Sequence, residues 1–216
     1  MIFFLSLSLL RILFVQLLAV MWWRIPGIKS RAQSSLTFTV LIPVRNEEDN
    51  ISALLRDLED QDYPQKLFEV IVIDDHSEDQ TATLVRDFID KSGLNIRLIQ
   101  LDDLNGKKAA ITMGIGQAVN EYILATDGDC RIPSTWIKEF ASRFGENDHP
   151  NMIAAPVLME GNDLFTSIQC LEFSALIGYG GASLQMGVAG TCNGANIGYK
   201  KEVFHEVGGY TGNEKI

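Results

Sequence analysis

Two patterns of apolar residues alternate along the middle of the chain. Short runs rich in β-branched residues predict buried strands over residues 37–44, 68–73, 96–101, 121–126 and 152–157. Between these runs, apolar residues recur at the three- and four-residue spacing of amphipathic helices, over residues 51–58, 84–89, 107–119 and 136–144. Strands separated by helices at this interval indicate βαβ units. We therefore predict an α/β fold with a largely parallel sheet.

Polar residues at the starts of two predicted helices suggest how those helices begin. Asn46 precedes the first helix, and Glu47 and Glu48 follow it where the helix dipole favours anions. Ser77 and Gln80 have the spacing of a capping box ahead of the second helix. We expect both sets of side chains to cap backbone N–H groups of the first turns.

Residues 2–23 form a long apolar run that only four residues interrupt, namely Ser6, Ser8, Arg11 and Gln16. A helix of this length spans the hydrocarbon core of a bilayer, and the apolar side chains offset the cost of one arginine. A cleaved signal peptide is the alternative, but the run has no basic start and no small-residue cleavage site. We predict a transmembrane anchor over residues 1–24 and a linker over residues 25–36.

Basic residues follow this run and none precedes it, since Arg24, Lys29 and Arg31 all lie on its C-terminal side. The positive-inside rule therefore predicts that the rest of the chain lies in the cytoplasm. Three cysteines without a C-x-x-C pair provide neither a disulfide framework nor a zinc site, and fit a reducing compartment.

Residues 173–199 depart from the alternating pattern, because they contain no charged residue and many glycines. A second membrane span is one explanation, but so many glycines weaken a helix. We predict a loop and an interfacial helix that lie near the bilayer.

Charge is distributed unevenly along the 216 residues, which suffice for one substantial domain. The chain has 18 Lys and Arg against 28 Asp and Glu, a net charge of −10. Four of the basic residues precede residue 32 and no acid does, which leaves 14 basic and 28 acidic residues in the remainder. Such an acidic body argues against nucleic acid as the main partner.

Carboxylates gather where the predicted strands end, which is where open parallel sheets bind ligands. Asp74 and Asp75 end the second strand, and Asp127-Gly128-Asp129 follows the fourth. Adjacent carboxylates repel one another unless a cation or hydrogen-bond donors meet them. The D-x-D spacing suits a loop that presents oxygen ligands to Mg²⁺ or Mn²⁺ beside substrate phosphates, and Lys107 offers a charge for phosphate oxygens.

Each of these features also has an ordinary structural explanation. D-x-D is common in solvated turns, Asp74-Asp75-His76-Ser77 fits a strand end with a helix cap, and Gly106-Lys107-Lys108 fits an exposed helix start. The three histidines show no metal-ligand spacing, and neither Cys130 nor Cys192 has an implied histidine partner. The aspartates and Lys107 are nevertheless all predicted at one edge of the sheet, and this common position favours a functional site.

Five ordered motifs resemble those of membrane-bound family 2 glycosyltransferases of the GT-A fold. They are VLIPVRNEEDNI, VIVIDDHSEDQT, GKKAAITMGI, YILATDGDC and GTCNGANIGYKKEVFHEVGGY. The resemblance covers residues 37–216 and implies a three-layer, Rossmann-like catalytic domain there. It implies a nucleotide-sugar donor, most often a UDP-sugar, and inverting, metal-assisted transfer to a glycan or lipid acceptor in polysaccharide or glycolipid biosynthesis.

The resemblance also implies roles for single residues. Pro43 and Glu47 would line the nucleotide pocket, and Asp75 would accept a hydrogen bond from the base, with Asp74 as the alternative. Lys107 would face the pyrophosphate.

The remaining implied roles concern the metal, the sugar and the acceptor. Asp127 and Asp129 would bind the donor ribose and the metal, Mn²⁺ or Mg²⁺. The residues near the transferred sugar and the acceptor would be Asn193, Gly194, Ala195 and Asn196.

A catalytic acidic pair is expected shortly after Gly208-Gly209-Tyr210, and one of its members would deprotonate the acceptor hydroxyl. The sequence ends at Ile216, and Glu214 does not match that pair. We therefore expect a C-terminally truncated catalytic domain whose general base lies beyond Ile216.

Two alternatives remain open at this point. One is a membrane domain that binds a nucleotide sugar without turning it over. The other is a receiver-like or phosphoryl-transfer α/β domain, in which Asp74, Asp75, Asp127 and a later lysine form an acidic metal pocket. In a receiver the acidic pair should end the first strand, whereas here a whole βα unit precedes it.

Overall fold

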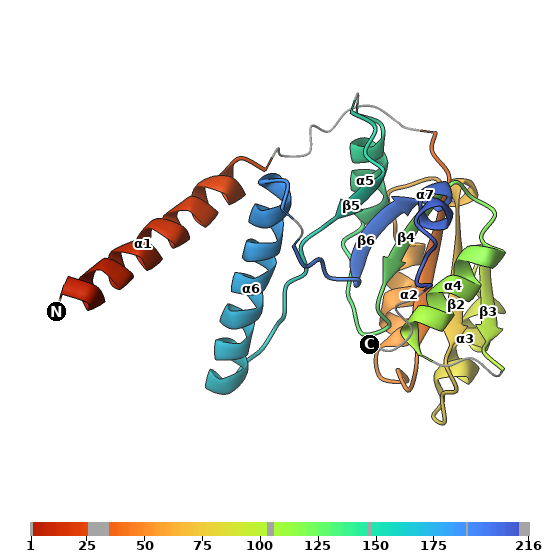
Figure 1. Cartoon of the computed structure of the whole chain (residues 1–216). Coiled ribbons are helices and arrows are strands. Elements are labelled where there is room, and N and C mark those ends of the chain that lie inside the picture. The colour runs from red at the N-terminus through yellow and green to blue at the C-terminus, as the bar shows by residue number, and fades with distance from the viewer. Residues whose placement is uncertain (1, 26–34, 103–105, 147, 189, 212–216) are drawn as a thin grey trace. The chain divides into compact units, whose positions relative to one another are not determined.

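The computed structural model describes residues 2–25, 35–102, 106–146, 148–188 and 190–211 (Figure 1). These fall into two units, of which the larger comprises Ile28–Ile153 and Gly194–Ile216 and the smaller comprises Met1–Gly27 and Ala154–Asn193. Most of the predicted linker, residues 26–34, lies outside the described residues, and so does Glu214.

A mixed six-stranded sheet forms the centre of the larger unit, in the order β3-β2-β1-β4-β6-β5. Its strands are β1 (Phe38–Val44), β2 (Phe68–Asp74), β3 (Ile96–Gln100), β4 (Tyr122–Thr126), β5 (Met152–Ala154) and β6 (Asn196–Lys200). β1 pairs in parallel with β2 and β4, and β2 pairs in parallel with β3. This confirms the predicted parallel sheet, whereas β6, which is antiparallel to β4, was not predicted.

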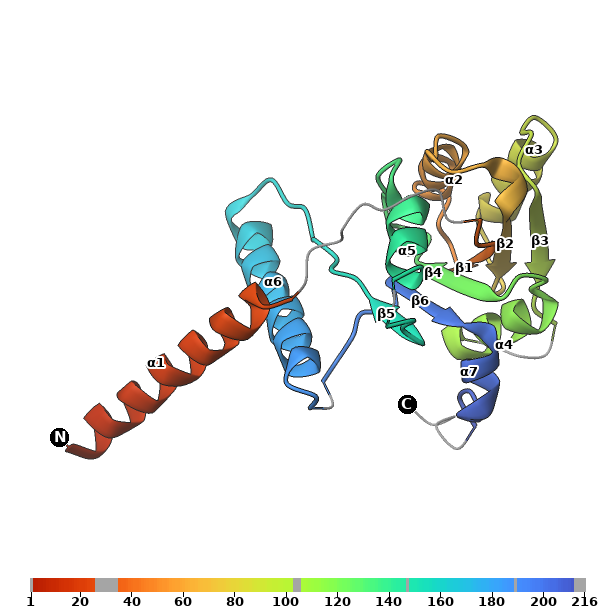
Figure 2. The ribbon, with the colours of Figure 1, turned by 90° about the horizontal axis from the view of Figure 1, so that it is seen from above.

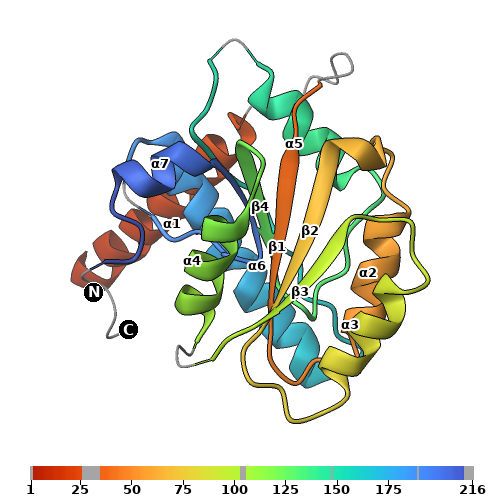
Figure 3. The same cartoon turned by 90° about the vertical axis from the view of Figure 1, so that its right-hand side faces the viewer.

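Helices cover both faces of this sheet. They are α2 (Ile51–Glu59), α3 (Thr81–Ile89), α4 (Lys107–Gln117), α5 (Trp136–Phe144) and α7 (Lys201–Glu206), with a short 3₁₀ helix, η1 (Gln65–Leu67). Figure 2 shows α4 and α7 on one face and α2, α3 and α5 on the other. Figure 3 shows the sheet between α4 and the α2–α3 pair. The predicted three-layer α/β architecture is therefore confirmed.

The alternation of side chains along the strands builds the two apolar layers. Leu41, Ile71, Ile73 and Ile123 belong to one buried cluster with residues of α4. Gly114 allows α4 to approach closely, since a Cβ there would lie 2.9 Å from Cδ2 of Leu41. The helix that begins with Lys107 is thus held firmly against the sheet.

Neither predicted helix cap forms. α2 starts at Ile51 after Asn50, α3 starts at Thr81 after Gln80, and neither start has a side-chain cap hydrogen bond. Asn46 and Ser77 instead bond to each other's loops, because partners distant in sequence compete with the local helix ends.

Two helices make up most of the smaller unit, α1 (Ile2–Trp23) and α6 (Leu164–Gln185). α6 begins with a capping box formed by Asp163 and Thr166 and continues through several glycines, residues that weaken a helix. A Cβ on Gly181 would lie 2.7 Å from the ring of Trp22, so the glycine allows the two helices to pack closely. Residues 173–199 were predicted as a loop and an interfacial helix, and their first half is helical, since α6 extends to Gln185; its position near a bilayer stays a prediction.

Within the part of the chain that the structure describes, we find no helix with both the length and the apolar character needed to cross a membrane. The transmembrane anchor predicted over residues 1–24 is therefore not supported.

Candidate active site

The loops that follow β1, β2 and β4 meet at the carboxyl edge of the sheet, because these three strands are neighbours. Val44 pairs in register with Asp74, and the backbone N–H of Asp75 donates to the carbonyl of Val44 at 2.8 Å. The turn after β4 is equally close, since a Cβ on Gly128 would lie 2.9 Å from Cγ1 of Val44 and 3.0 Å from Cγ of Glu47. The structure thus brings the predicted carboxylates to one edge.

The first two of these loops are joined by reciprocal hydrogen bonds. The backbone N–H of Asn46 donates to Oγ of Ser77 at 3.0 Å, and Oδ1 of Asn46 accepts from the N–H of Glu78 at 2.8 Å. The N–H of Glu47 donates to Oγ1 of Thr81 at 2.8 Å. Asn46 has a φ of 56°, a conformation that asparagine tolerates better than most residues. These bonds hold Glu47, one of the predicted nucleotide contacts, beside the end of β2.

The two adjacent aspartates differ in what they contact. Asp74 is almost fully buried, and its carboxylate accepts from the N–H of Ser77 at 3.1 Å and from Nε2 of Gln100 at 3.1 Å. Asp75 instead accepts from the N–H of Gly106 at 2.8 Å and lies 3.0 Å from Nδ1 of His76. Asp74 therefore supports the turn, whereas Asp75 connects to the residue that precedes Lys107.

Lys107 and Asp127 form an ion pair between α4 and the end of β4. Both side chains are partly exposed, and exposed pairs contribute little to stability, so either partner is able to exchange for a ligand. Gly194 lies beside the ammonium, since a Cβ there would be 3.7 Å from Nζ of Lys107. The pair thus joins α4 to the end of β4, with Gly194 beside it.

The predicted sugar and acceptor residues are divided between the two units. Ala195 is buried, and Oδ1 of Asn196 accepts from Nε1 of Trp136 at 2.9 Å. Asn193 belongs to the smaller unit. Asn196 therefore has a structural partner in α5, and Gly194 lies beside Lys107, a predicted nucleotide-binding residue.

A bidentate ion pair that the sequence did not reveal fixes the chain just after Asp129. Nε and Nη2 of Arg131 donate to the Asp57 carboxylate at 2.6 and 2.7 Å. This hydrogen bonding holds the pKa of Asp57 below its usual value of 3.8. No local signal announces the pair, because the two residues are 74 positions apart. The pair anchors the aspartate turn to α2.

The donor set at this edge fits a divalent metal that arrives with a diphosphate. Within the described residues, no group of three or more His, Cys, Asp or Glu side chains is arranged to hold a metal alone. Asp127 and Asp129 offer two carboxylates, and Mg²⁺ is commonly held by one or two carboxylates together with substrate phosphates. Lys107, which pairs with Asp127, adds a positive charge next to this carboxylate.

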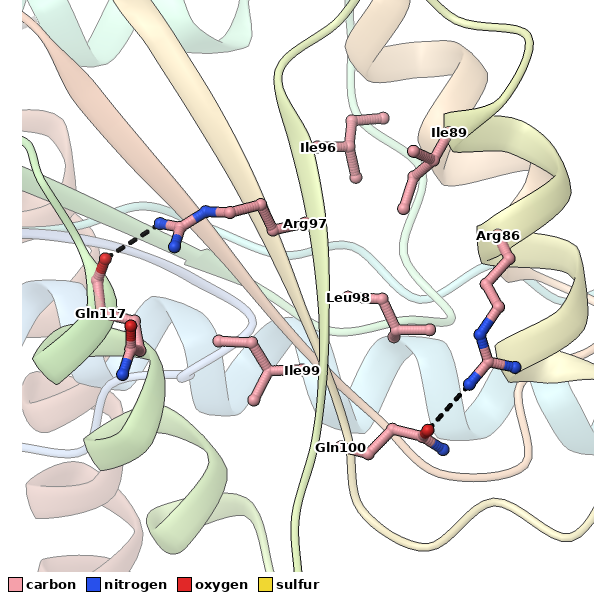
Figure 4. Close-up of a pocket in the computed structure, with 8 residues that line it drawn as sticks. All are labelled: Arg86, Ile89, Ile96, Arg97, Leu98, Ile99, Gln100 and Gln117. Carbon is pink, nitrogen blue, oxygen red and sulfur yellow. Dashed lines mark hydrogen bonds between the residues drawn. The ribbon is translucent and has the colours of Figure 1, made fainter.

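A separate cavity of about 670 Å³ lies along the edge strand β3 (Figure 4). Its walls include Arg97, which donates to the carbonyl of Gln117 at 2.9 Å, and Arg86, which donates to Gln100 at 2.7 Å. None of the predicted site residues lines it. The cavity therefore gives a second location against which the carboxyl-edge site can be tested.

Comparison with known families removes one of the two open alternatives. The sequence model described as Glycosyl transferase family 2 matches residues 39–208. The chain belongs to glycosyl transferase family 2. This excludes the receiver-like alternative, and the predicted GT-A fold is confirmed.

Individual relatives agree with this assignment. The chain is 27% identical over 183 residues to the poly-beta-1,6-N-acetyl-D-glucosamine synthase of Staphylococcus epidermidis, covering 84% of this chain and 43% of that protein. It is similar to the structure of Staphylococcus aureus TarS 1–349 in complex with UDP-GlcNAc, with 25% identity, a TM-score of 0.58, and coverage of 80% and 48%.

A third relative supports the fold. The Pyrobaculum calidifontis mannosyltransferase, solved with GDP-Man and Mn²⁺, matches with a TM-score of 0.68 at 20% identity, covering 90% of this chain and 55% of that one. This chain therefore spans about half of each of these relatives.

Proposed function

We propose that this chain binds a nucleotide sugar at the carboxyl edge of its sheet and acts in transfer of the sugar to a glycan or lipid acceptor. The observation that carries the proposal is the Lys107–Asp127 pair, with Gly194 beside it, in a family 2 chain. The predicted membrane partner and the predicted cytoplasmic location of the larger unit stay predictions.

The proposed donor is a UDP-sugar. TarS, a relative that matches at 25% identity, was solved with UDP-GlcNAc, whereas the more distant mannosyltransferase was solved with GDP-Man. Asp75 is the proposed contact for the base, because its carboxylate lies at the strand end and has acceptor capacity beyond its bonds to His76 and Gly106. GDP is the comparison ligand for any binding measurement.

The proposed chemistry starts with departure of the nucleoside diphosphate. The Lys107 ammonium exchanges Asp127 for the β-phosphate and stabilises the charge that develops there. Asp127 and Asp129 would hold Mn²⁺ or Mg²⁺, and the bound ion would supply further positive charge at the diphosphate.

Inverting transfer also needs a carboxylate that accepts the proton of the acceptor hydroxyl. The position of that base stays a prediction, since Glu214 and the residues beside it are not described.

A transfer assay with a charge-removing variant tests this proposal. Lys107→Ala should lower the release of UDP from radiolabelled UDP-GlcNAc, whether the sugar passes to an acceptor or to water, by about 100-fold, the usual effect of removing one preorganised donor from a developing charge. Lys138→Ala is the matched control, because Lys138 also forms an exposed ion pair, with Asp62, but lies in α5. The assay uses membranes containing the chain, with polysaccharide and lipid extracts as acceptors.

Two results would count against the proposal. Equal loss of UDP release in both variants would contradict the role of Lys107. If the wild-type chain binds UDP but neither transfers nor hydrolyses the sugar of UDP- or GDP-linked donors, the non-catalytic alternative would replace catalysis.

A further inference from the structure

His76 adopts a backbone conformation that few residues other than glycine accept. Its φ is 59°, and the other described non-glycine residues with positive φ are Asn46 and His149. A left-handed conformation is strained for a histidine unless its surroundings hold it there. The contacts of the imidazole ring therefore show which interactions hold His76 in this conformation.

Both ring nitrogens of His76 face acceptors. Nδ1 lies 3.0 Å from Oδ1 of Asp75, and Nε2 lies 2.9 Å from the backbone carbonyl oxygen of Asp102. A carboxylate and a carbonyl only accept hydrogen bonds, whereas a neutral imidazole carries a single N–H. Both bonds form together only when the ring is the imidazolium.

The charges around the ring are consistent with the imidazolium. The hydrogen bond to Asp75 is the main cause that raises the pKa of His76, followed by the bond to the carbonyl of Asp102. The negative charge of Asp75 acts in the same direction, while desolvation and the positive charge of Arg45 oppose it. The groups that face His76 are thus Asp75, Asp102 and Arg45.

These contacts fix both described ends of the connection between β3 and α4. His76 holds Asp102 at one end, and the second oxygen of Asp75 accepts from the N–H of Gly106 at the other, at 2.8 Å. Gly106 has a φ of 89° and directly precedes Lys107, the first residue of α4. A change at His76 is therefore transmitted through Asp75 and Gly106 to Lys107.

We propose that His76, as the imidazolium, is a positioning residue that aligns Asp75 and Lys107 for the donor nucleotide. This proposal rests on the proposed function, because it names the residue that prepares the same site. The protonated ring makes both bonds below its raised pKa and loses one of them as the pH rises through that pKa. Donor affinity should fall over the same pH range.

Two glycine variants separate this role from relief of backbone strain. His76→Gly keeps the positive φ without strain and removes both ring contacts. His149→Gly is the matched control, since His149 also has a positive φ, of 41°, lies between α5 and β5, and is not one of the proposed site residues. His76→Asn is a second variant, because asparagine tolerates this conformation with a short side chain.

Calorimetry with UDP and Mg²⁺ between pH 5.5 and 8.5 gives the test, with Kd taken as a ratio of variant to wild type. The ratio for His76→Gly should be about tenfold at pH 6, the effect of a lost charge-assisted bond, and should fall as the pH rises through the pKa of His76, where the wild type keeps only one of its two ring bonds. His149→Gly should stay near one throughout. UDP titrates equally in the measurements on variant and wild type, so the ratio of the two Kd values is free of its contribution.

Nitrogen NMR of the three histidines gives an independent readout. The His76 signals, identified by their loss in His76→Gly, should show both ring nitrogens protonated at pH 6 and a pKa above the usual 6.5. A neutral ring at pH 6, or a Kd ratio that does not change with pH, would overturn the positioning role while leaving the proposed function intact. Absence of UDP and GDP binding by the wild type at every pH would refute the proposed function, and the role of His76 with it.

Discussion

Gly128 is the position where one added methyl group should disturb the proposed metal and diphosphate site most directly. Gly128 is buried, and a Cβ there would lie 2.9 Å from Cγ1 of Val44 and 3.0 Å from Cγ of Glu47. Val44 is itself 3% exposed and has no room to retreat. The turn that carries Asp127 and Asp129 must therefore move outward in Gly128→Ala.

The size of the effect follows from the cost of overpacking. Adding a methyl group to a well-packed site costs about 1–3 kcal/mol. If the turn moves to relieve this strain, it must return to its original position before UDP and metal can bind. The strain free energy then lowers the binding affinity by the same amount. This corresponds to a loss of about 5- to 140-fold in affinity for UDP with Mn²⁺.

Gly93→Ala is the matched control for this experiment. Nothing lies within 4 Å of a Cβ added there, and Gly93 is not one of the proposed site residues. Its affinity for UDP should stay within about threefold of the wild type, as measured by calorimetry with both proteins shown to be folded. Equal affinities of Gly128→Ala and the wild type would refute the reasoning, because the turn would then not belong to the binding site.

Three further variants test separate parts of the structure. Asp129→Ala should weaken Mn²⁺-dependent UDP binding by about tenfold or more in calorimetry, and equal affinity with and without metal would contradict the metal assignment. Gly114→Ala should have a lower free energy of unfolding in urea than Gly116→Ala, by about 1–3 kcal/mol, because only a Cβ at residue 114 would clash with Leu41 and Ile73. Both variants gain the same helix propensity, so this gain does not contribute to the difference. Asp57→Asn should be less stable than the wild type above pH 4, where the lowered pKa of Asp57 stabilises the fold. The difference in free energy of unfolding should shrink as the pH falls through that pKa. If urea unfolding shows the same difference at every pH, the ion pair with Arg131 is not the cause of the lost stability.

The parallel part of the sheet was predictable because its signals are local. The runs that became β1, β2 and β4 are almost entirely buried, and such strands are recognisable from their apolar residues alone. The convergence of Asp75 and Asp127 followed from the rule that ligands bind at the carboxyl ends of parallel strands.

Elements that depend on distant partners were missed. β6 is a short segment with a central glycine, and only its pairing with β4 makes it a strand. A Cβ on Gly198 would lie 2.8 Å from side-chain atoms of both Leu124 and Phe140, so this glycine is needed for packing rather than for a turn. Likewise, α6 continues through glycines that lower helix propensity but allow close packing against Trp22.

The hydrogen bonds and backbone conformations within the site also could not be predicted from the sequence. Asn46 is of a residue type that often caps helices, yet its hydrogen-bond partners are Ser77 and Glu78, more than 30 residues away. His76 stood in a motif where either a cap or a binding loop was expected, and its positive φ and two acceptor partners become visible only in three dimensions.

Mapping the contact residues of UDP by NMR, in the presence of Mg²⁺, tests the central claim most directly. The account predicts saturable chemical-shift changes at the carboxyl edge, at Glu47, Asp75, Lys107 and Asp129, and much smaller changes when Mg²⁺ is removed. Changes centred on the cavity of β3, at Arg86, Arg97 and Gln100, would contradict it, as would the absence of any change.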